Sequence, residues 1–175
     1  MRAWLVCLIA LLPAACAELP SSSPVSLALG PPLLRFAADG RISLRQGERS
    51  DHLRFRWEHA PDRDVVLLMS PLGQGLAELT RDAAGARLVR ANQATIAADT
   101  LPQLALRVVG APLPLEAMAD WLRGARPELS GETDGWRVAI RDTSAFRQSR
   151  LVHVLEARRE DVELKLIVDD WDVPE

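Results

Sequence analysis

The chain has little cysteine, no tyrosine, and no apolar run long enough to cross a membrane as a helix. Its two cysteines, Cys7 and Cys16, both lie near the start, so the 159 residues that follow Cys16 contain none to form a disulfide. The 21 basic residues are outnumbered by 24 acidic ones. These absences exclude a disulfide-stapled domain and a membrane-spanning helix. They also argue against a nucleic-acid partner, which favours a strongly basic surface.

The chain also lacks a recognisable set of catalytic or metal-binding residues. Its histidines have no cysteine or carboxylate at the spacing of a metal site, and no nucleophile is paired with a base. Gly73-Gln74-Gly75 precedes a predicted strand, whereas a phosphate-binding loop needs a helix N-terminus. The acidic residues 169–172 are typical of a solvated strand end rather than a calcium loop. We therefore expect a protein that is not an enzyme and has no metal or cofactor.

What the chain does contain is a secretory signal at its start. Arg2 precedes the apolar run 3–12, and Pro13-Ala14-Ala15 leads directly to Cys16. A basic start, a short apolar core and small residues before a cleavage site are typical of a signal peptide. The cysteine directly after two alanines predicts a lipoprotein signal, with residues 1–15 removed and Cys16 lipidated. The alternative is an ordinary signal peptide with a chance cysteine near its end.

Beyond the signal, residues 16–34 are predicted to be a flexible tether, because this stretch is rich in serine and proline. Residues 35–175 are long enough for one domain, which we expect to be a monomer. There, apolar and polar residues alternate in pairs of runs around turns, as in antiparallel hairpins with one buried face. Strands are expected over 41–45, 53–57, 65–69, 76–80, 87–90, 93–98, 136–140, 151–157 and 162–168.

Between the two groups of strands, the apolar spacing becomes that of helices. The first predicted helix begins at Asp99 or Thr100 and ends at Gly110, and the second ends at Gly124. Their apolar faces carry Leu101, Leu104, Ala105 and Val108, and then Leu115, Met118, Ala119 and Leu122. Many hairpins interrupted by one helical pair predict a curved sheet with a helical lid, at about 99–124, on its concave face.

The abundance of aliphatic side chains suggests what the concave face could hold. A surface of leucine, valine and methionine suits flexible guests such as acyl chains, which need only apolar area. The alternative is that all of these residues form an ordinary core, and composition alone favours that alternative.

Several motifs from Phe36 onwards, in a fixed order, carry a resemblance. They are Arg54-Phe55-Arg56-Trp57, the strand and turn Leu67-Leu68-Met69-Ser70-Pro71-Leu72-Gly73, the segment Val109-Gly110-Ala111-Pro112-Leu113-Pro114-Leu115, the helix end Trp121-Leu122-Arg123-Gly124, and the closing strand 162–173. Together they resemble the LolB family of outer-membrane lipoprotein receptors. The resemblance implies an incomplete antiparallel β-barrel with a helical lid that encloses an apolar cavity. One departure is that family members begin with a helix, which the proline-rich segment up to Pro32 does not supply.

The resemblance also implies a function. A family member is anchored in the outer membrane, faces the periplasm, accepts lipoproteins from the periplasmic carrier LolA, and inserts them into the outer-membrane lipid. Ala17 fits this role, because in enterobacterial relatives an aspartate after the lipidated cysteine signals retention in the inner membrane. The resemblance further implies that Leu72, between Pro71 and Gly73, is an exposed apolar finger that enters the membrane. Without the resemblance, the residues favour the alternative that Leu72 folds back and covers the edge of the core.

Eight apolar residues are candidates for the wall of the acyl-chain cavity. They are Val66, Leu68, Leu76, Leu101, Leu104, Leu115, Met118 and Leu122. Two other functions remain open at this point. A lipid-anchored structural or scaffold lipoprotein with no acyl-chain cargo would have a tightly filled core. An anchored hydrolase ranks last, because no nucleophile and base are visible.

Overall fold

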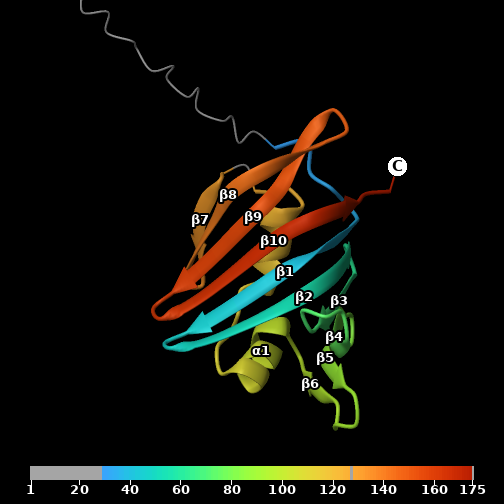
Figure 1. The fold of residues 1–175 in the computed structure, drawn as a ribbon, viewed down its shortest axis with the longest axis vertical. Helices are drawn as coiled ribbons and strands as arrows, with labels where there is room; N and C mark the ends of the chain where they lie inside the picture. Colours follow the sequence, from blue (N-terminus) through green and yellow to red (C-terminus); the bar gives the residue numbers. More distant parts are fainter. Residues whose placement is uncertain (1–28, 127, 175) are drawn as a thin grey trace, which may run out of the picture.

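The computed structural model describes residues 29–126 and 128–174, and these form a single curved antiparallel sheet with two short helices (Figure 1). The ten strands lie in the order β6-β5-β4-β3-β2-β1-β10-β9-β8-β7. Their bounds are β1 Phe36–Gln46, β2 Arg49–Ala60, β3 Arg63–Met69, β4 Gly75–Asp82, β5 Gly85–Arg90, β6 Ile96–Ala98, β7 Ser130–Thr133, β8 Trp136–Phe146, β9 Ser149–Arg159 and β10 Val162–Asp172. The two edge strands do not pair with each other, so the predicted incomplete barrel is confirmed.

Most of the sequence-based element predictions agree with the structure. The β1–β2 hairpin turns at Gly47, whose φ of +57° favours glycine. It pairs Ile42 with Leu53, so the apolar side chains of both strands share the concave face. Two differences are local: the predicted strand over 93–98 is confined to β6, and β7 was not anticipated. The predicted signal peptide, Cys16 and most of the tether lie outside the described residues.

One strand pair is not a hairpin. Each neighbouring pair in the sheet is also adjacent along the chain, apart from β1 and β10. The ladder of these two strands shifts register between Asp39 and Gly40. A side chain at Gly40 would place its Cβ only 2.1 Å from the carbonyl oxygen of Ile167, so the close approach of the two backbones here requires glycine.

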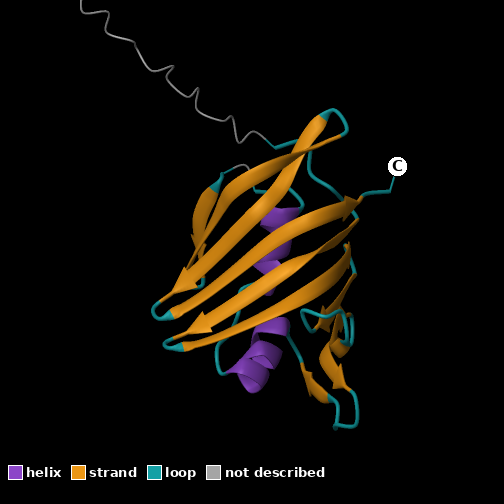
Figure 2. Ribbon diagram, viewed as in Figure 1, coloured by secondary structure: helices purple, strands orange, loops and turns teal. Residues whose placement is uncertain are grey.

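Both helices, α1 (Leu101–Val109) and α2 (Leu115–Leu122), lie on the same side of the sheet (Figure 2). The Thr100 hydroxyl accepts a hydrogen bond from the Gln103 amide at the start of α1. Gly110 ends α1 in the left-handed region, with φ of +80°. Among the described residues, no helix is long and apolar enough to cross a membrane.

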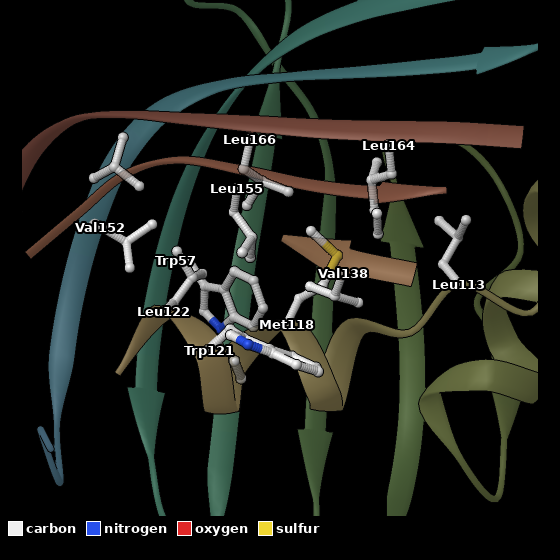
Figure 3. Close-up of a cluster of buried hydrophobic side chains, with 14 of the residues drawn as sticks. Trp57, Leu113, Met118, Trp121, Leu122, Val138, Val152, Leu155, Leu164 and Leu166 are labelled. Carbon is white, nitrogen blue, oxygen red and sulfur yellow. The ribbon is translucent and has the colours of Figure 1, made fainter. Parts of the chain in front are cut away.

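The two helices pack into two apolar clusters, and Ala105 of α1 belongs with α2 to the larger one. The large cluster lies between α2 and strands β1, β2 and β8–β10, and Figure 3 shows Met118, Trp121 and Leu122 of α2 within it. The small cluster lies between α1 and strands β4–β6. Its fully buried members are Ala86, Leu88, Leu101 and Leu104. The space between these two clusters is where the candidate site is found.

Gly40→Ala tests the close approach of β1 and β10. The added methyl group would collide with the Ile167 backbone, which cannot move as a flexible side chain can, so we expect a loss of about 2–3 kcal/mol in the free energy of unfolding. Gly75→Ala is the matched control, because no atom lies within 4 Å of its added Cβ. Denaturant unfolding of both variants measures the difference, and equal stabilities would contradict this account of Gly40.

Candidate functional site

A cavity of about 460 Å³ lies on the concave face of the sheet, under α1. Its volume falls within the range of small-molecule sites, roughly 300–1,000 Å³. Its wall is apolar except for Arg49, Asp51, Asp64 and Arg90. The apolar part comprises Ile42, Leu44, Leu53, Phe55, Trp57, Val66, Leu68, Leu76, Ala77, Leu79, Leu88, Leu101, Leu104, Ala105, Val108, Val109, Leu113, Leu115, Leu164 and Leu166.

The cavity exists because the small cluster under α1 does not close fully against the large cluster on the same sheet. Leu101 and Leu104 belong to the small cluster, yet they also line the cavity. Across the space, Phe55, Leu164 and Leu166 belong to the large cluster. Helix α1 therefore roofs a gap between the two clusters: Leu101 and Leu104 pack in the small one, and Ala105 packs in the large one.

Six of the eight candidate wall residues lie on the wall of this cavity. These are Val66, Leu68, Leu76, Leu101, Leu104 and Leu115. Met118 and Leu122 lie elsewhere: both are at most 1% exposed, and they pack in the large cluster against β8–β10 (Figure 3). Pro112 and Pro114 interrupt the chain between the two helices, so α2 is free to face the main core. The Trp136 indole holds this interruption in place by donating a hydrogen bond to the Pro112 carbonyl at 3.1 Å.

Strands β1, β2 and β10 supply wall residues that the sequence-based list omitted. Alternation had already placed Ile42, Leu53 and Leu164 on apolar strand faces, which was the available signal. The pairing of β1 with β10 sets Leu44 opposite Leu164 and so brings both to one wall. Periodicity alone does not show which distant strands are neighbours.

The cavity runs along β2, from an exposed end to a buried one. At the exposed end, Arg49 and Asp51 form an ion pair of 2.9 Å. Leu76, which is 44% exposed, lies toward this end as well, because β4 pairs there with the last residues of β3. We take this end as the mouth, because its apolar wall is open to solvent.

A buried carboxylate closes the inner end of the cavity. Asp64 accepts hydrogen bonds from Trp57 Nε1 at 2.9 Å and Arg81 Nε at 2.6 Å, and it lies 2.7 Å from His59 Nδ1. Burial by itself raises the pKa of Asp64, but the hydrogen bonds from His59, Trp57 and Arg81 outweigh it, so the net pKa lies below the ordinary aspartate value. Sequence reasoning missed this group, because Asp64 lies on β3 and its partners come from the strands on either side, β2 and β4.

The turn between β3 and β4 holds the most exposed of the large apolar side chains in the described chain. Leu72 is 89% exposed. The turn is braced by its own backbone: the Ser70 amide donates to the Gln74 carbonyl at 2.8 Å, and the Gly73 amide donates to the Ser70 carbonyl at 2.9 Å. Leu72 therefore projects away from the domain and does not cover the core edge.

Comparison with known proteins identifies the family. Residues 34–171 match the family described as outer membrane lipoprotein LolB. The chain belongs to the LolB family. Proteins named outer-membrane lipoprotein LolB from Nitrosomonas europaea and Chromobacterium violaceum are each 33% identical to it over 78% of this chain, and over 72% and 79% of their own length. The protein of that name from an Azoarcus species is 29% identical over 97% of this chain and 94% of its own length.

Membership of the LolB family confirms the resemblance read from the motifs and the predicted location at the outer membrane. The family is one of outer-membrane lipoproteins. Within residues 29–126 and 128–174, no group of histidine, cysteine and acidic side chains is arranged to hold a metal ion.

Asp64→Asn tests the buried carboxylate. Because its pKa is lower in the folded chain, the ionised group stabilises the fold above the ordinary aspartate pKa, and that contribution is lost as the pH falls through the folded-state pKa. We expect the variant to lose about 2 kcal/mol of stability at neutral pH. The gap to wild type should shrink below about pH 4. The exposed turn residue Asp62, replaced by Asn, serves as control, and a pH-independent gap for Asp64→Asn would contradict the assignment.

Proposed function

We propose that this protein is the outer-membrane receptor of lipoprotein sorting: it accepts lipoproteins from the periplasmic carrier LolA and inserts them into the outer membrane. Cys16 carries the lipid that anchors it, and the residues after Cys16 tether the domain to the membrane. The predicted tether of residues 16–34 is too long at its end, because the Gly30 amide donates to the Arg150 carbonyl at 3.0 Å and the Leu33 amide donates to the Arg123 carbonyl at 2.7 Å. The acyl chains of the cargo pass through the cavity under α1. Membership of the LolB family and the order of the motifs support this role.

The observation that carries the proposal is the apolar cavity. Exposing an acyl chain to water costs about 0.8 kcal/mol per CH₂ group, hence on the order of 10 kcal/mol for a whole chain. No carrier releases its cargo through water at that cost without an energy source. A receiver with an apolar cavity, placed mouth to mouth with the carrier, removes the aqueous step. A cavity whose affinity lies between those of the carrier and the bilayer then passes the chain onward.

Helix α1 is the movable part of this cavity. It has nine residues, and helices this short take their stability from tertiary packing. That packing is divided: Leu101 and Leu104 belong to the small cluster, and Ala105 belongs to the large one. Opening α1 therefore costs less than unfolding the sheet. Helix α2, buried in the large cluster, stays in place.

The space under α1 also separates this proposal from its main rival. A structural or scaffold lipoprotein has no need for an unfilled apolar volume, and unfilled volume lowers stability. A cavity of about 460 Å³ with an apolar wall favours a protein that binds a guest. If acyl chains failed to enter the cavity, the scaffold role would be favoured instead.

Ala77→Trp tests whether acyl chains occupy the cavity. Ala77 is a small, partly buried wall residue on β4, and an indole there would fill part of the space. We expect the affinity for a fluorescent fatty-acyl probe to fall about tenfold or more, since several methylene contacts are lost. Ala97→Trp, at an exposed position on β6, should bind the probe as wild type does. If Ala77→Trp is folded and binds the probe normally, the acyl chain lies elsewhere.

The exposed Leu72 is the proposed membrane contact. A single leucine buried in lipid contributes only about 1.5–3 kcal/mol, which suits a transient contact and not an anchor. The internal hydrogen bonds of the turn hold its backbone, so that insertion does not require the loop to reorganise.

Leu72→Glu should leave folding and uptake of cargo from the carrier intact, because the side chain has little contact with the domain. It should reduce delivery of lipoprotein cargo to liposomes by about tenfold or more, since a carboxylate does not enter the bilayer at low cost. Leu34→Glu is the control, because Leu34 is also exposed, at 73%, but lies outside the turn. Delivery of cargo by Leu72→Glu at the wild-type rate would rule out this contact.

A further inference from the structure

The opposite face of the sheet carries a second hollow beside the Leu72 turn. It is a groove of about 500 Å³ over β10, β1 and β2, and Pro71 forms part of its wall. The side chains along it that point away from the cavity are Arg41, Ser43, His52, Arg54, Lys165, Ile167 and Asp169. We call this hollow the basic groove. It touches the same turn that presents Leu72 to the membrane.

The register of the strands explains the shape of the basic groove. Ser43 on β1 lies opposite Lys165 on β10 and opposite His52 on β2. In the next row on this face, Arg41 lies opposite Arg54. The small Ser43 side chain is thus flanked by longer nitrogen-bearing side chains on the neighbouring strands, which leaves a depression at its position.

The charges of the basic groove are only partly balanced. Arg41 is held by Asp169, with N–O distances of 2.7 and 3.0 Å. Lys165 reaches Glu156 at 3.2 Å, but that carboxylate is shared with Arg141 and Arg158. Arg54 has no carboxylate partner within ion-pair distance in the described part of the chain.

Two like charges directly opposite each other destabilise a strand pair, and Arg41 and Arg54 are such a pair. An anion above Ser43 would meet the guanidinium group of Arg54, which is unpaired in the described chain, with Arg41, which Asp169 already holds, beside it. Arginine is well suited to bind phosphate oxygens through paired N–H donors. The formal net charge of the chain is −3, so attraction to an anionic surface has to come from a local feature such as this one.

We infer that the basic groove binds the phosphodiester headgroup of an anionic phospholipid while Leu72 enters the bilayer. The inference rests on the proposed membrane contact of Leu72 and adds a second point of contact to it. Leu72 supplies apolar insertion, and Arg54 with Arg41 supplies attraction to the headgroup region. Two contacts on one side of the turn also set the orientation of the domain on the membrane, which a single leucine does not.

Delivery of lipoprotein cargo to two kinds of vesicle tests the headgroup site. One vesicle is phosphatidylcholine alone, and the other contains added phosphatidylglycerol. The full lipidated protein should deliver cargo faster to the anionic vesicles, by about fivefold for one arginine at the surface. High salt should remove the gain, because exposed charges are screened. Arg54→Gln should lose most of the gain, and Arg54→Lys, which keeps the charge, should retain most of it.

Arg137→Gln is the matched control, because Arg137 is also an exposed strand arginine with no ion pair in the described chain, but lies on β8, away from the basic groove. The Arg137→Gln variant should deliver cargo to anionic vesicles with the full wild-type increase in rate. Equal wild-type rates on both vesicles, or an undiminished gain in Arg54→Gln, would overturn the headgroup site and leave the receptor function standing. Failure of wild type to deliver to either vesicle would overturn the receptor function, and the headgroup site with it.

Discussion

The pairing of β1 with β10 is the constraint on which the rest of this structure depends. It joins a run of hairpins from β1 to β6 with a second run from β7 to β10, and the described sheet has no other link between them. The cavity and the basic groove both extend across the β1–β10 pair. The cavity takes Leu44 and Leu164 from its concave side, and the basic groove takes Ser43 and Lys165 from its other side. The ladder tolerates no side chain at Gly40, where the two backbones approach most closely.

The unequal roles of the two helices follow from how each is packed. Helix α2 completes the main core, where Met118 and Trp121 are at most 1% exposed. Helix α1 contributes Leu101 and Leu104 to a smaller cluster with β4–β6, and its inner face is left over a space that no side chain fills. An unfilled apolar volume costs stability, and the function proposed for this protein gives that volume a guest, an acyl chain. The helix that completes the main core is thereby a different one from the helix that roofs the cavity.

Local pattern was enough to predict much of this fold. Alternation predicts the faces of β1 and β2, and the sequence predicts that α1 starts at Asp99 or Thr100 and stops at Gly110; in the structure Thr100 is the cap. The residues that line the cavity were harder to predict. They depend on which distant strands are neighbours and on how the prolines between α1 and α2 orient α2. Met118 has the same helical spacing as a wall residue, yet it faces the core. Asp64 and the basic groove were invisible in the sequence, since each is assembled from side chains on three strands.

Hydrogen exchange of the full lipidated protein, with and without a saturating acyl-chain ligand, tests the central claim most directly. A guest beneath α1 should stabilise that helix against local opening, so amides in residues 101–109 should exchange more slowly when the ligand is bound. Amides in residues 115–122 of α2, already held by the main core, should change little. Unchanged exchange in α1 at saturating ligand would contradict the account of a cavity that receives acyl chains under a movable helix.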